Sequence, residues 1–353
     1  VLLSIPIMLL LWNMAPILLH LGQEESTVFL TQSYLQAIVW GFPALIGFSV
    51  LKNLVSALNR PQIIMIIMVN GIVVNVIANY ILMFGKLGLP ALGLAGIGWA
   101  STLTLWSQFI AGMSFVSLDK ELRTYQLFSN WYHFDFLAFS EIIKVGLPTA
   151  LVFAMEISLN TFIAYLMGYL GTVPLAAHQI AIQTAGIVFM VPLGISYATT
   201  MRVGQKLGEN DPKGVRRAGF VGIGLGVIFV NIVALIFWIF PDFIAGIYLD
   251  TKNPDNVEVV QLAITLLSLT AVYQICDGMQ VIAGGALRGL KDTRIPLLIS
   301  LFSYWLIGLG SGYFLGIYLH WGSIGLWFGL VLGLASAAIN LTWRFYGKTT
   351  VKV

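Results

Sequence analysis

Charged residues are scarce in this chain of 353 residues, because Asp, Glu, Lys and Arg together supply only 9% of the sequence, against about a quarter in soluble domains. Hydrophobic residues supply 58%, and the mean hydropathy is +0.90. Uncharged stretches of roughly 20 residues suit helices that cross a hydrocarbon layer about 30 Å thick. A bacterial β-barrel would alternate apolar and polar residues instead. The composition therefore predicts an all-α integral membrane protein.

Cysteine is almost absent as well. Cys276 is the single cysteine, so no disulfide within the chain stabilises the fold. A methionine start is also lacking, since the sequence begins at Val1 inside an apolar run, and we expect the N-terminus of the protein to be missing. The net charge of +3 is small and gives no reason to expect a nucleic-acid partner.

Apolar runs separated by breaks predict ten membrane spans. Their approximate ranges are 1–20, 33–57, 62–85, 92–117, 139–168, 175–200, 217–240, 257–286, 294–317 and 321–345. When these spans are threaded alternately through the membrane, sixteen of the eighteen Lys and Arg residues fall on one side, and only Lys86 and Lys252 fall on the other. The positive-inside rule then predicts a cytoplasmic C-terminus and a chain that starts at the cytoplasmic face.

Internal similarity at a shared offset indicates a duplication. The similar pairs are LWNMAPILLHL at 11–21 with FWIFPDFIAGIYL at 237–249, SALNRP ending at Pro61 with GALRGLKDTRIP ending at Pro296, and AGIGWAS at 95–101 with GSIGLWFG at 322–329. Spans 1 to 4 thus pair with spans 7 to 10, as in two six-helix halves that lack the first two helices. We expect an incomplete N-lobe of four helices at 1–117, a cytoplasmic linker at 118–138, and a six-helix C-lobe with a short cytoplasmic tail at 139–353.

Glycines and prolines inside the spans have structural interpretations. Two sets of glycines show the small-xxx-small spacing that lets membrane helices approach closely. These are Gly308, Gly312 and Gly316, and Gly325, Gly329 and Gly333. Pro43, Pro148 and Pro192 also lie inside predicted spans, where we expect them to bend the helices.

The strongest functional signal is the position of two acids. Of fifteen Asp and Glu residues, thirteen fall in loops or at span ends, whereas Glu156 and Asp277 fall well inside the membrane. At 1.5 Å per residue, Glu156 lies about 21 Å from the cytoplasmic start of its helix and Asp277 about 12 Å from the cytoplasmic end of its own. A buried ionisable group costs several kcal/mol unless it is hydrated, paired or neutralised. Since no Lys or Arg is expected at this depth, we expect both acids to face one cavity and to bind a proton, Na⁺ or an organic cation.

Polar neighbours share helix faces with the two acids. Asn160 comes four residues after Glu156, while Tyr273 and Gln274 come four and three residues before Asp277. Oxygen ligands of this kind suit a hard cation, so Na⁺ is a candidate ligand at Glu156, Asp277 and Tyr273. Hydrogen bonding between helices is the alternative interpretation of the three neighbours.

Other polar features give weaker indications. Asn75 and Asn79 are also four residues apart and are candidates either for a cavity lining in the N-lobe or for helix packing. His178, near the external start of its helix, is interpreted as a packing or hydrogen-bonding residue. The sequence GKT at 347–349 resembles the end of a phosphate loop, but Thr342 stands where the first glycine belongs. We therefore expect no ATP and no cofactor, only transported Na⁺ or H⁺.

Five stretches resemble one transporter family. They are GLPALGLAGIGWAS, EIIKVGLPTALVFAMEISL, LAAHQIAIQ, TTMRVGQKLGENDP and AVYQICDGMQVIAGGALRGLKDTRIP, and they are similar to the NorM-type branch of the multidrug and toxic compound extrusion (MATE) transporters. The resemblance implies twelve helices in two six-helix lobes related by a pseudo-twofold axis. It also implies cation-coupling roles for Glu156, Asp277 and Tyr273, and places Asn75 and Asn79 near the N-lobe cavity. The functional aspartate of the family's first helix is not in this sequence.

The function implied by the resemblance is a multi-pass secondary antiporter of the bacterial inner membrane. It would export cationic lipophilic drugs or dyes in exchange for Na⁺ or H⁺ by alternating access, as a monomer in the lipid bilayer and without enzymatic activity. One alternative is a flippase for lipid-linked precursors of a related fold, which predicts a cationic cavity. Another is an intramembrane enzyme, which needs a nucleophile and a base at one depth, and the sequence offers no such pair.

Overall fold

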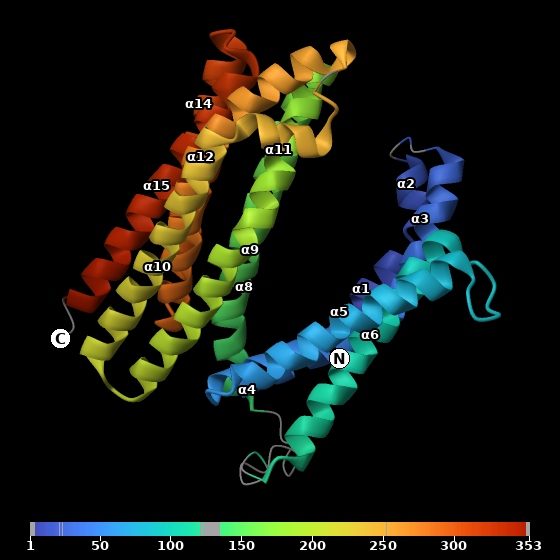
Figure 1. The fold of residues 1–353 in the computed structure, drawn as a ribbon. Coiled ribbons are helices and arrows are strands. Elements are labelled where there is room, and N and C mark those ends of the chain that lie inside the picture. Colours follow the sequence, from blue (N-terminus) through green and yellow to red (C-terminus); the bar gives the residue numbers. More distant parts are fainter. Residues whose placement is uncertain are drawn as a thin grey trace. The chain divides into compact units, whose positions relative to one another are not determined.

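The computed structural model describes residues 4–20, 22, 24–120, 122, 135–251 and 253–350. All regular secondary structure in these ranges is helical (Figure 1), which confirms the all-α prediction. The chain forms two compact units, Val1–Phe134 and Asp135–Val353. Of the expected linker at 118–138, residues 121 and 123–134 lie outside the described residues, and the predicted division into lobes stays a prediction.

The N-terminal unit is organised around α6. Its described elements are α1 (Ser4–Trp12), α2 (Ala15–His20), α3 (Glu25–Ile38), the short 3-10 helix η1 (Val39–Gly41), α4 (Phe42–Ala57), α5 (Pro61–Phe84) and α6 (Gly93–Leu118). Helix α6 packs against α3, α4 and α5. Pro43 lies in the first turn of α4, directly after η1, and not in a helix interior. Proline suits that position because the first amides of a helix have no partner within it, so Pro43 marks a junction between two helices.

Residues 4–20 form two short helices where the sequence predicts one span. The break between α1 and α2 precedes Pro16, which has no N–H with which to continue a helix. Gln32 of α3 bonds to both sides of this break. Its Oε1 accepts from the amide of Ala15 at 2.9 Å, and its Nε2 donates to the carbonyl of Trp12. The single helix expected at 1–20 is therefore wrong, and a side chain of the next helix satisfies the backbone groups that the break leaves unpaired.

The C-terminal unit is organised around α12. Its described elements are α8 (Phe136–Leu170), α9 (Thr172–Gly208), α10 (Pro212–Ile239), α11 (Pro241–Tyr248), η2 (Pro254–Asn256), α12 (Val257–Gly289), α13 (Arg294–Leu301), the π-helical η3 (Phe302–Leu309), α14 (Gly310–Tyr313), the π-helical η4 (Phe314–Tyr318) and α15 (Gly322–Thr350). Helix α12 packs against α9, α10 and α15 (Figure 1), and much of it is buried. A polar side chain on α12 is therefore enclosed by neighbouring helices.

Eight helical segments in the described residues are long and apolar enough to cross a membrane. They are Glu25–Ala57, Pro61–Phe84, Phe136–Leu170, Thr172–Gly208, Pro212–Ile239, Pro254–Gly289, Arg294–Tyr318 and Gly322–Thr350. These segments confirm a protein that spans the membrane several times. Helices α1, α2 and α6 are not among them, and the count of ten spans and the twofold relation between lobes stay predictions.

Two long helices of the C-terminal unit contain prolines. Pro148 lies inside α8 and Pro192 inside α9, and both helices continue past them. Each proline removes one backbone donor from its helix. The start of α8 is set by Asp135, whose Oδ1 accepts from the amides of Leu137 at 2.8 Å and Ala138 at 3.1 Å. An N-cap of this kind satisfies amides that have no partner within the helix.

The last two spans pack nearly backbone to backbone. The predicted glycine sets are Gly308, Gly312 and Gly316 on the segment from η3 to η4, and Gly325, Gly329 and Gly333 on α15. A Cβ added at Gly329 would lie 2.2 Å from the Cα of Gly312, and one at Gly325 would lie 2.5 Å from the backbone nitrogen of Gly316. No side chain fits between the two segments, which confirms the prediction of close packing.

Candidate cation site in the C-terminal unit

The structure brings Glu156 of α8 close enough to Asp277 of α12 for the two carboxyls to interact electrostatically. Asp277 is 2% exposed, whereas Glu156 is half-buried and lines a cavity. Gln280, one turn after Asp277, joins them. Its Nε2 donates to Asp277 Oδ1 at 3.2 Å, and its side chain also lies beside the Glu156 carboxyl. Two acids from different helices therefore share one amide group.

Tyr304 fixes the orientation of that amide. The Tyr304 hydroxyl, on η3, donates to Gln280 Oε1 at 2.8 Å, and its side chain is fully buried. Because the amide oxygen is occupied by this donor, the amide NH₂ of Gln280 is directed to the acids. The hydrogen-bonded series Tyr304, Gln280 and Asp277 thus connects η3 with α12. Neither Gln280 nor Tyr304 is among the residues predicted from the sequence, although the position of Gln280, three residues after Asp277, places it on the same helical face.

The three predicted neighbours of the acids have different surroundings. The Tyr273 side chain is 5% exposed and lies beside that of Asn160. The Nε2 atom of Gln274 donates to the carbonyl of Ala185 at 2.6 Å, so this side chain makes the bond between helices that was the alternative interpretation. Within the described part of the chain, Asn160 Oδ1 and Gln274 Oε1 are buried and have no hydrogen-bond partner. Two buried oxygen acceptors are therefore unused on the helices that carry the acids.

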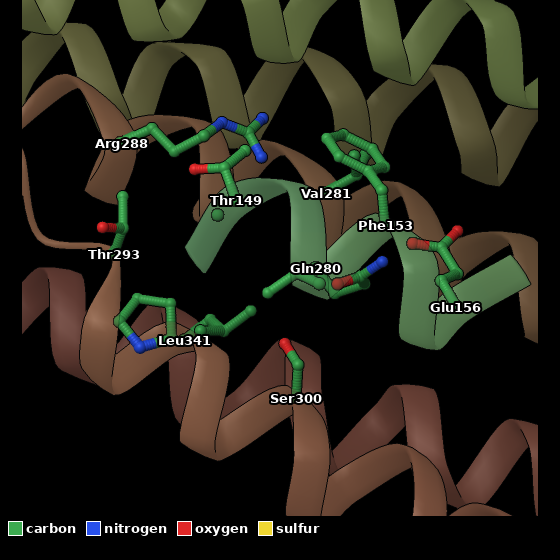
Figure 2. Close-up of a pocket in the computed structure, with 12 residues that line it drawn as sticks. Thr149, Phe153, Glu156, Gln280, Val281, Arg288, Thr293, Ser300 and Leu341 are labelled. Carbon is green, nitrogen blue, oxygen red and sulfur yellow. The ribbon is translucent and has the colours of Figure 1, made fainter. Parts of the chain in front are cut away.

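A small cavity opens beside the Glu156 carboxyl (Figure 2). Its volume is about 30 Å³, and a water molecule needs about 10–15 Å³ measured in this way. The lining comes from α8, α12, α13 and α15 and includes Glu156, Gln280 and Ser300. Asp277 does not line the cavity but bonds to Gln280, which does. Of the two acids that we expect to face one cavity, Glu156 lines this one and Asp277 does not.

Arg288, one of the sixteen Lys and Arg residues that the sequence predicts on the cytoplasmic side, also lines this cavity (Figure 2). Its Nη2 donates to Ser196 Oγ at 2.8 Å, and its guanidinium carbon lies 5.7 Å from the centroid of the Phe153 ring. Arg288 interacts electrostatically with Glu156. Helical side chains point toward the N-terminal end of their helix, which carries the guanidinium back toward the acids. The side chain of Arg288 therefore reaches the cavity of Glu156, whereas the sequence predicts no Lys or Arg at the depth of the two acids.

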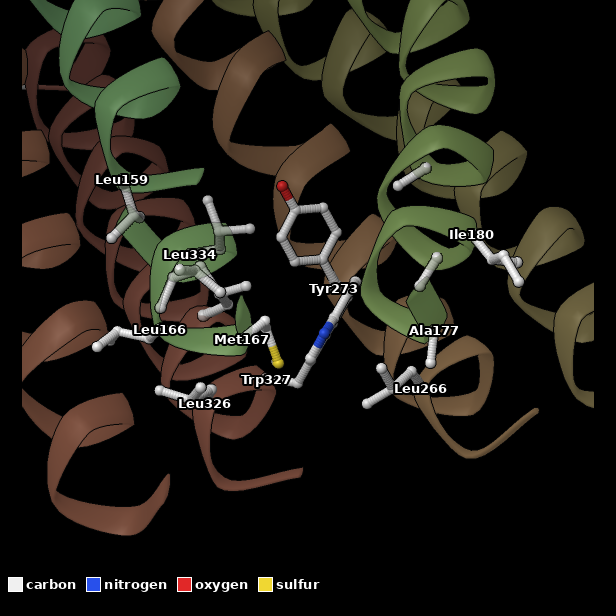
Figure 3. Close-up of a cluster of buried hydrophobic side chains, with 14 of the residues drawn as sticks. Leu159, Leu166, Met167, Ala177, Ile180, Leu266, Tyr273, Leu326, Trp327 and Leu334 are labelled. Atoms are coloured by element: carbon white, nitrogen blue, oxygen red, sulfur yellow. The ribbon is translucent and has the colours of Figure 1, made fainter. Parts of the chain in front are cut away.

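Apolar and aromatic side chains enclose one side of this network. Tyr273 lies in a buried cluster with Met167 and Leu334 (Figure 3). Its ring centroid is 5.6 Å from that of Trp327, which in turn lies 5.7 Å from that of His178. His178 is 1% exposed, and its contact with Trp327 confirms the interpretation as a packing residue. The cluster keeps water away from one end of the polar network, where hydrogen bonds are strong.

The N-terminal unit holds the remaining two predicted residues, both on α5. Asn79 Nδ2 donates to Asn75 Oδ1 at 2.8 Å, and Asn75 Nδ2 donates to Thr104 Oγ1 of α6 at 3.2 Å. Both asparagines are half-buried. The pair therefore forms a hydrogen bond between α5 and α6, as the packing interpretation requires.

The site contains carboxyl, amide and hydroxyl oxygens. Among the residues that the structure describes, no group of three or more His, Cys, Asp or Glu side chains is placed to hold a metal ion as a resident cofactor. The carboxyl pair can instead hold a transported cation, because a cation neutralises charge that is costly in a low-dielectric interior. Oxygen atoms are also the ligands that hard cations prefer.

Comparison with known sequences identifies a family and similar proteins. The family model MatE matches residues 1–81 and 148–314. The probable multidrug resistance protein NorM of Synechococcus sp. is 41% identical over 349 residues, which are 99% of this chain and 75% of that protein. The protein of the same name from Rhizobium meliloti is 40% identical over 337 residues, 95% of this chain and 72% of that protein.

Solved structures share the fold at lower sequence identity. A crystal structure of MATE in the bent conformation has a TM-score of 0.86 and 19% identity, and the match covers 99% of this chain and 75% of that one. The eukaryotic MATE transporter AtDTX14 has a TM-score of 0.82 and 20% identity over 97% of this chain and 75% of its own. At such identities the likeness shows a common fold.

Proposed function

The chain belongs to the MATE family of multidrug transporters, and from this premise we propose that it is a cation-coupled antiporter that exports lipophilic organic cations. Na⁺ or H⁺ moves down its gradient and occupies the carboxyl pair of Glu156 and Asp277, while the drug leaves in the opposite direction. The membrane potential supplies about 2.3 kcal/mol per charge per 100 mV. No enzymatic step is part of the proposal.

The shared amide between the two acids is the observation on which the proposal rests. Glu156 and Asp277 lie beside Gln280, and Arg288 supplies one positive charge in the cavity lining. Two carboxylates outnumber one guanidinium, so an unloaded site has an excess of negative charge that an incoming cation neutralises. The flippase alternative needs an excess of positive charge to bind an anionic head group, which this arrangement does not offer.

The size of the cavity separates the two kinds of cation. A volume of about 30 Å³ accommodates a proton carrier, a water molecule or a dehydrated Na⁺, whereas sites for drug-sized ligands measure about 300–1,000 Å³. The organic cation therefore binds only in a state in which this region has opened. Alternation between a closed, ion-loaded state and an open, drug-binding state gives the coupling that antiport requires.

The unused oxygens favour Na⁺ as one of the two candidate ions. Asn160 Oδ1 and Gln274 Oε1 have no hydrogen-bond partner in the described residues, and an unpaired buried acceptor costs about 1–3 kcal/mol. A Na⁺ ion near Glu156 and Asp277, with Asn160 and the Tyr273 hydroxyl in its ligand set, would offset part of that cost. A proton needs no such ligand set, because it binds to a single carboxylate oxygen.

The orientation follows from the charge asymmetry of the sequence. We propose a monomeric chain in the bacterial inner membrane with its C-terminus in the cytoplasm, since sixteen of the eighteen Lys and Arg residues fall on one predicted side. A protease site added after Val353 should be cut in everted vesicles and protected in intact spheroplasts. The reverse pattern would refute the orientation without affecting the transport proposal.

Drug uptake into everted vesicles that contain the full-length protein tests the function. A fluorescent lipophilic cation should accumulate when a Na⁺ gradient or a pH gradient is imposed, and imposing the two separately identifies the coupling ion. Asp277→Asn should abolish the gradient-driven part of uptake. Asp242→Asn is the matched control, because Asp242 is an exposed acid on α11 of the same unit. Gradient-driven transport at the original rate in Asp277→Asn would refute the proposal.

A further inference from the structure

An open groove between α9 and α10 is not used by the proposed transport site. Its volume is about 540 Å³, and it lies where the end of α9 meets the start of α10. Three of its lining residues are basic, namely Arg202, Lys206 and Arg217, and one is acidic, Asp211. Ile195, Val221 and Leu225 line it as well, so its wall changes from basic to apolar along the two helices.

The basic side chains of the groove are incompletely paired. Lys206 Nζ lies 2.6 Å from Glu209 Oε2 and 4.0 Å from Asp211 Oδ2, and Arg202 donates to the neutral amide of Gln205 at 3.2 Å. Among the described residues no acid lies within ion-pair distance of Arg217 or Arg202. Two guanidinium groups therefore have free donors, which bind phosphate oxygens well.

An apolar stripe continues from the groove along α10. After Arg217, exposed apolar residues recur at intervals of three or four, which keeps them on one face of the helix. They are Val221 at 53% exposed, Leu225 at 56%, Ile228 at 60%, Ile232 at 53% and Leu235 at 53%. The stripe from Val221 to Leu235 is about 21 Å long at 1.5 Å per residue, somewhat longer than one leaflet of a hydrocarbon layer about 30 Å thick.

We propose that this groove binds an anionic phospholipid, with the phosphate head group at Arg202 and Arg217 and an acyl chain along the α10 stripe. The charge, the position at the basic ends of two membrane helices and the apolar stripe all match one amphiphilic molecule. A free phosphate would use only the basic residues. A cationic drug would meet three positive side chains, so the groove and the carboxyl site have opposite charge preferences.

Native mass spectrometry of the full-length protein, titrated with phosphatidylglycerol or phosphatidylcholine, tests the proposal. The protein should bind phosphatidylglycerol more tightly than phosphatidylcholine. Arg217→Gln should weaken phosphatidylglycerol binding about fivefold, because a basic residue near a lipid surface contributes about 1 kcal/mol. The triple variant, which combines Arg217→Gln with Arg202→Gln and Lys206→Gln, should bind phosphatidylglycerol about a hundredfold more weakly. Arg294→Gln is the matched control, since Arg294 is exposed at the start of α13 and should leave binding unchanged.

One further variant and two competing ligands in the same binding experiment distinguish a lipid from other ligands. Leu225→Asn should weaken phosphatidylglycerol binding while leaving any binding of glycerol phosphate unchanged. Equal binding of the two lipids, equal weakening by Arg217→Gln and Arg294→Gln, or displacement of the lipid by equimolar glycerol phosphate or by the organic cation would each overturn the proposal. None of the groove residues contacts Glu156 or Asp277, so loss of lipid binding and loss of ion-driven transport are separate results.

Discussion

The two units of the chain both contain polar side chains between helices, but they differ in whether those side chains can carry charge. In the C-terminal unit Glu156 and Asp277 share Gln280. In the N-terminal unit Asn75 and Asn79 bond to each other and to α6 through neutral groups. An asparagine pair orients helices, whereas a carboxyl pair also responds to a cation. The proposed ion coupling therefore draws on charged side chains of the C-terminal unit, and the asparagine pair of the N-terminal unit offers none.

The largest effect is expected from Glu156→Gln. The change keeps the shape of the side chain but removes one of the two charges that attract the ion, and affinity for the coupling ion should fall on the order of a hundredfold, which corresponds to about 2.7 kcal/mol. Binding of radioactive sodium, or proton release on drug addition, measures it. Glu258→Gln, an exposed change in the first turn of α12, should have no effect. Unchanged ion affinity in Glu156→Gln would remove the distinction between the units.

Tyr304→Phe should weaken ion binding about tenfold. The variant removes the donor that holds Gln280 Oε1, and a hydrogen bond of this kind contributes about 1 kcal/mol, with a further penalty for the buried oxygen left unpaired. The Gln280 amide is then free to turn its oxygen toward the acids. Tyr313→Phe is the control, because Tyr313 is 53% exposed in α14 of the same unit. Equal affinities for the two variants would show that the amide orientation is unimportant.

Arg288→Gln should act in the opposite direction. Removing a positive charge from the cavity lining strengthens the attraction between the acids and an incoming cation, so ion affinity should rise about threefold. Isothermal titration calorimetry of the purified protein with the ion measures the change in affinity, and Arg294→Gln provides the charge-matched control. A fall in affinity would mean that Arg288 supports the site through its bond to Ser196 more than it competes with the ion.

The smallest effect on ion binding is expected from Asn75→Leu combined with Asn79→Leu. Ion affinity should change by less than about twofold, while loss of the bond to Thr104 should lower stability by about 1 kcal/mol. Thermal unfolding in detergent and ion binding are measured on the same sample. A tenfold loss of ion affinity would show that the asparagine pair contributes to ion binding. It would contradict the assignment of ion binding to the carboxyl pair alone.

Features determined by local spacing were predictable from the sequence. The helices follow the apolar runs, and the two acids stand out because few other charges lie inside the spans. The glycine sets are a further case, since their four-residue spacing defines a face and their lack of side chains defines the approach of Gly312 to Gly329.

Features determined by contacts between distant segments were not predictable from one sequence. Tyr304 is 24 residues from Gln280 and on another element, and nothing in its local sequence indicates that bond. Arg288 was assigned by the position of its backbone, although its long side chain reaches back along α12 to the cavity. The break before Pro16 depends on Gln32 of the next helix.

The glycine contact between the last two spans also affects how the results of a mutational scan of this protein are interpreted. A Cβ at Gly325, Gly329 or Gly333 would lie 2.8 Å or less from backbone atoms of the facing segment, so nearly every substitution there should reduce the amount of folded protein in the membrane. A resistance assay alone would score these positions as severely as the proposed coupling residues Glu156 and Asp277. Only a scan that also measures the amount of protein in the membrane would separate positions required for folding from positions required for transport.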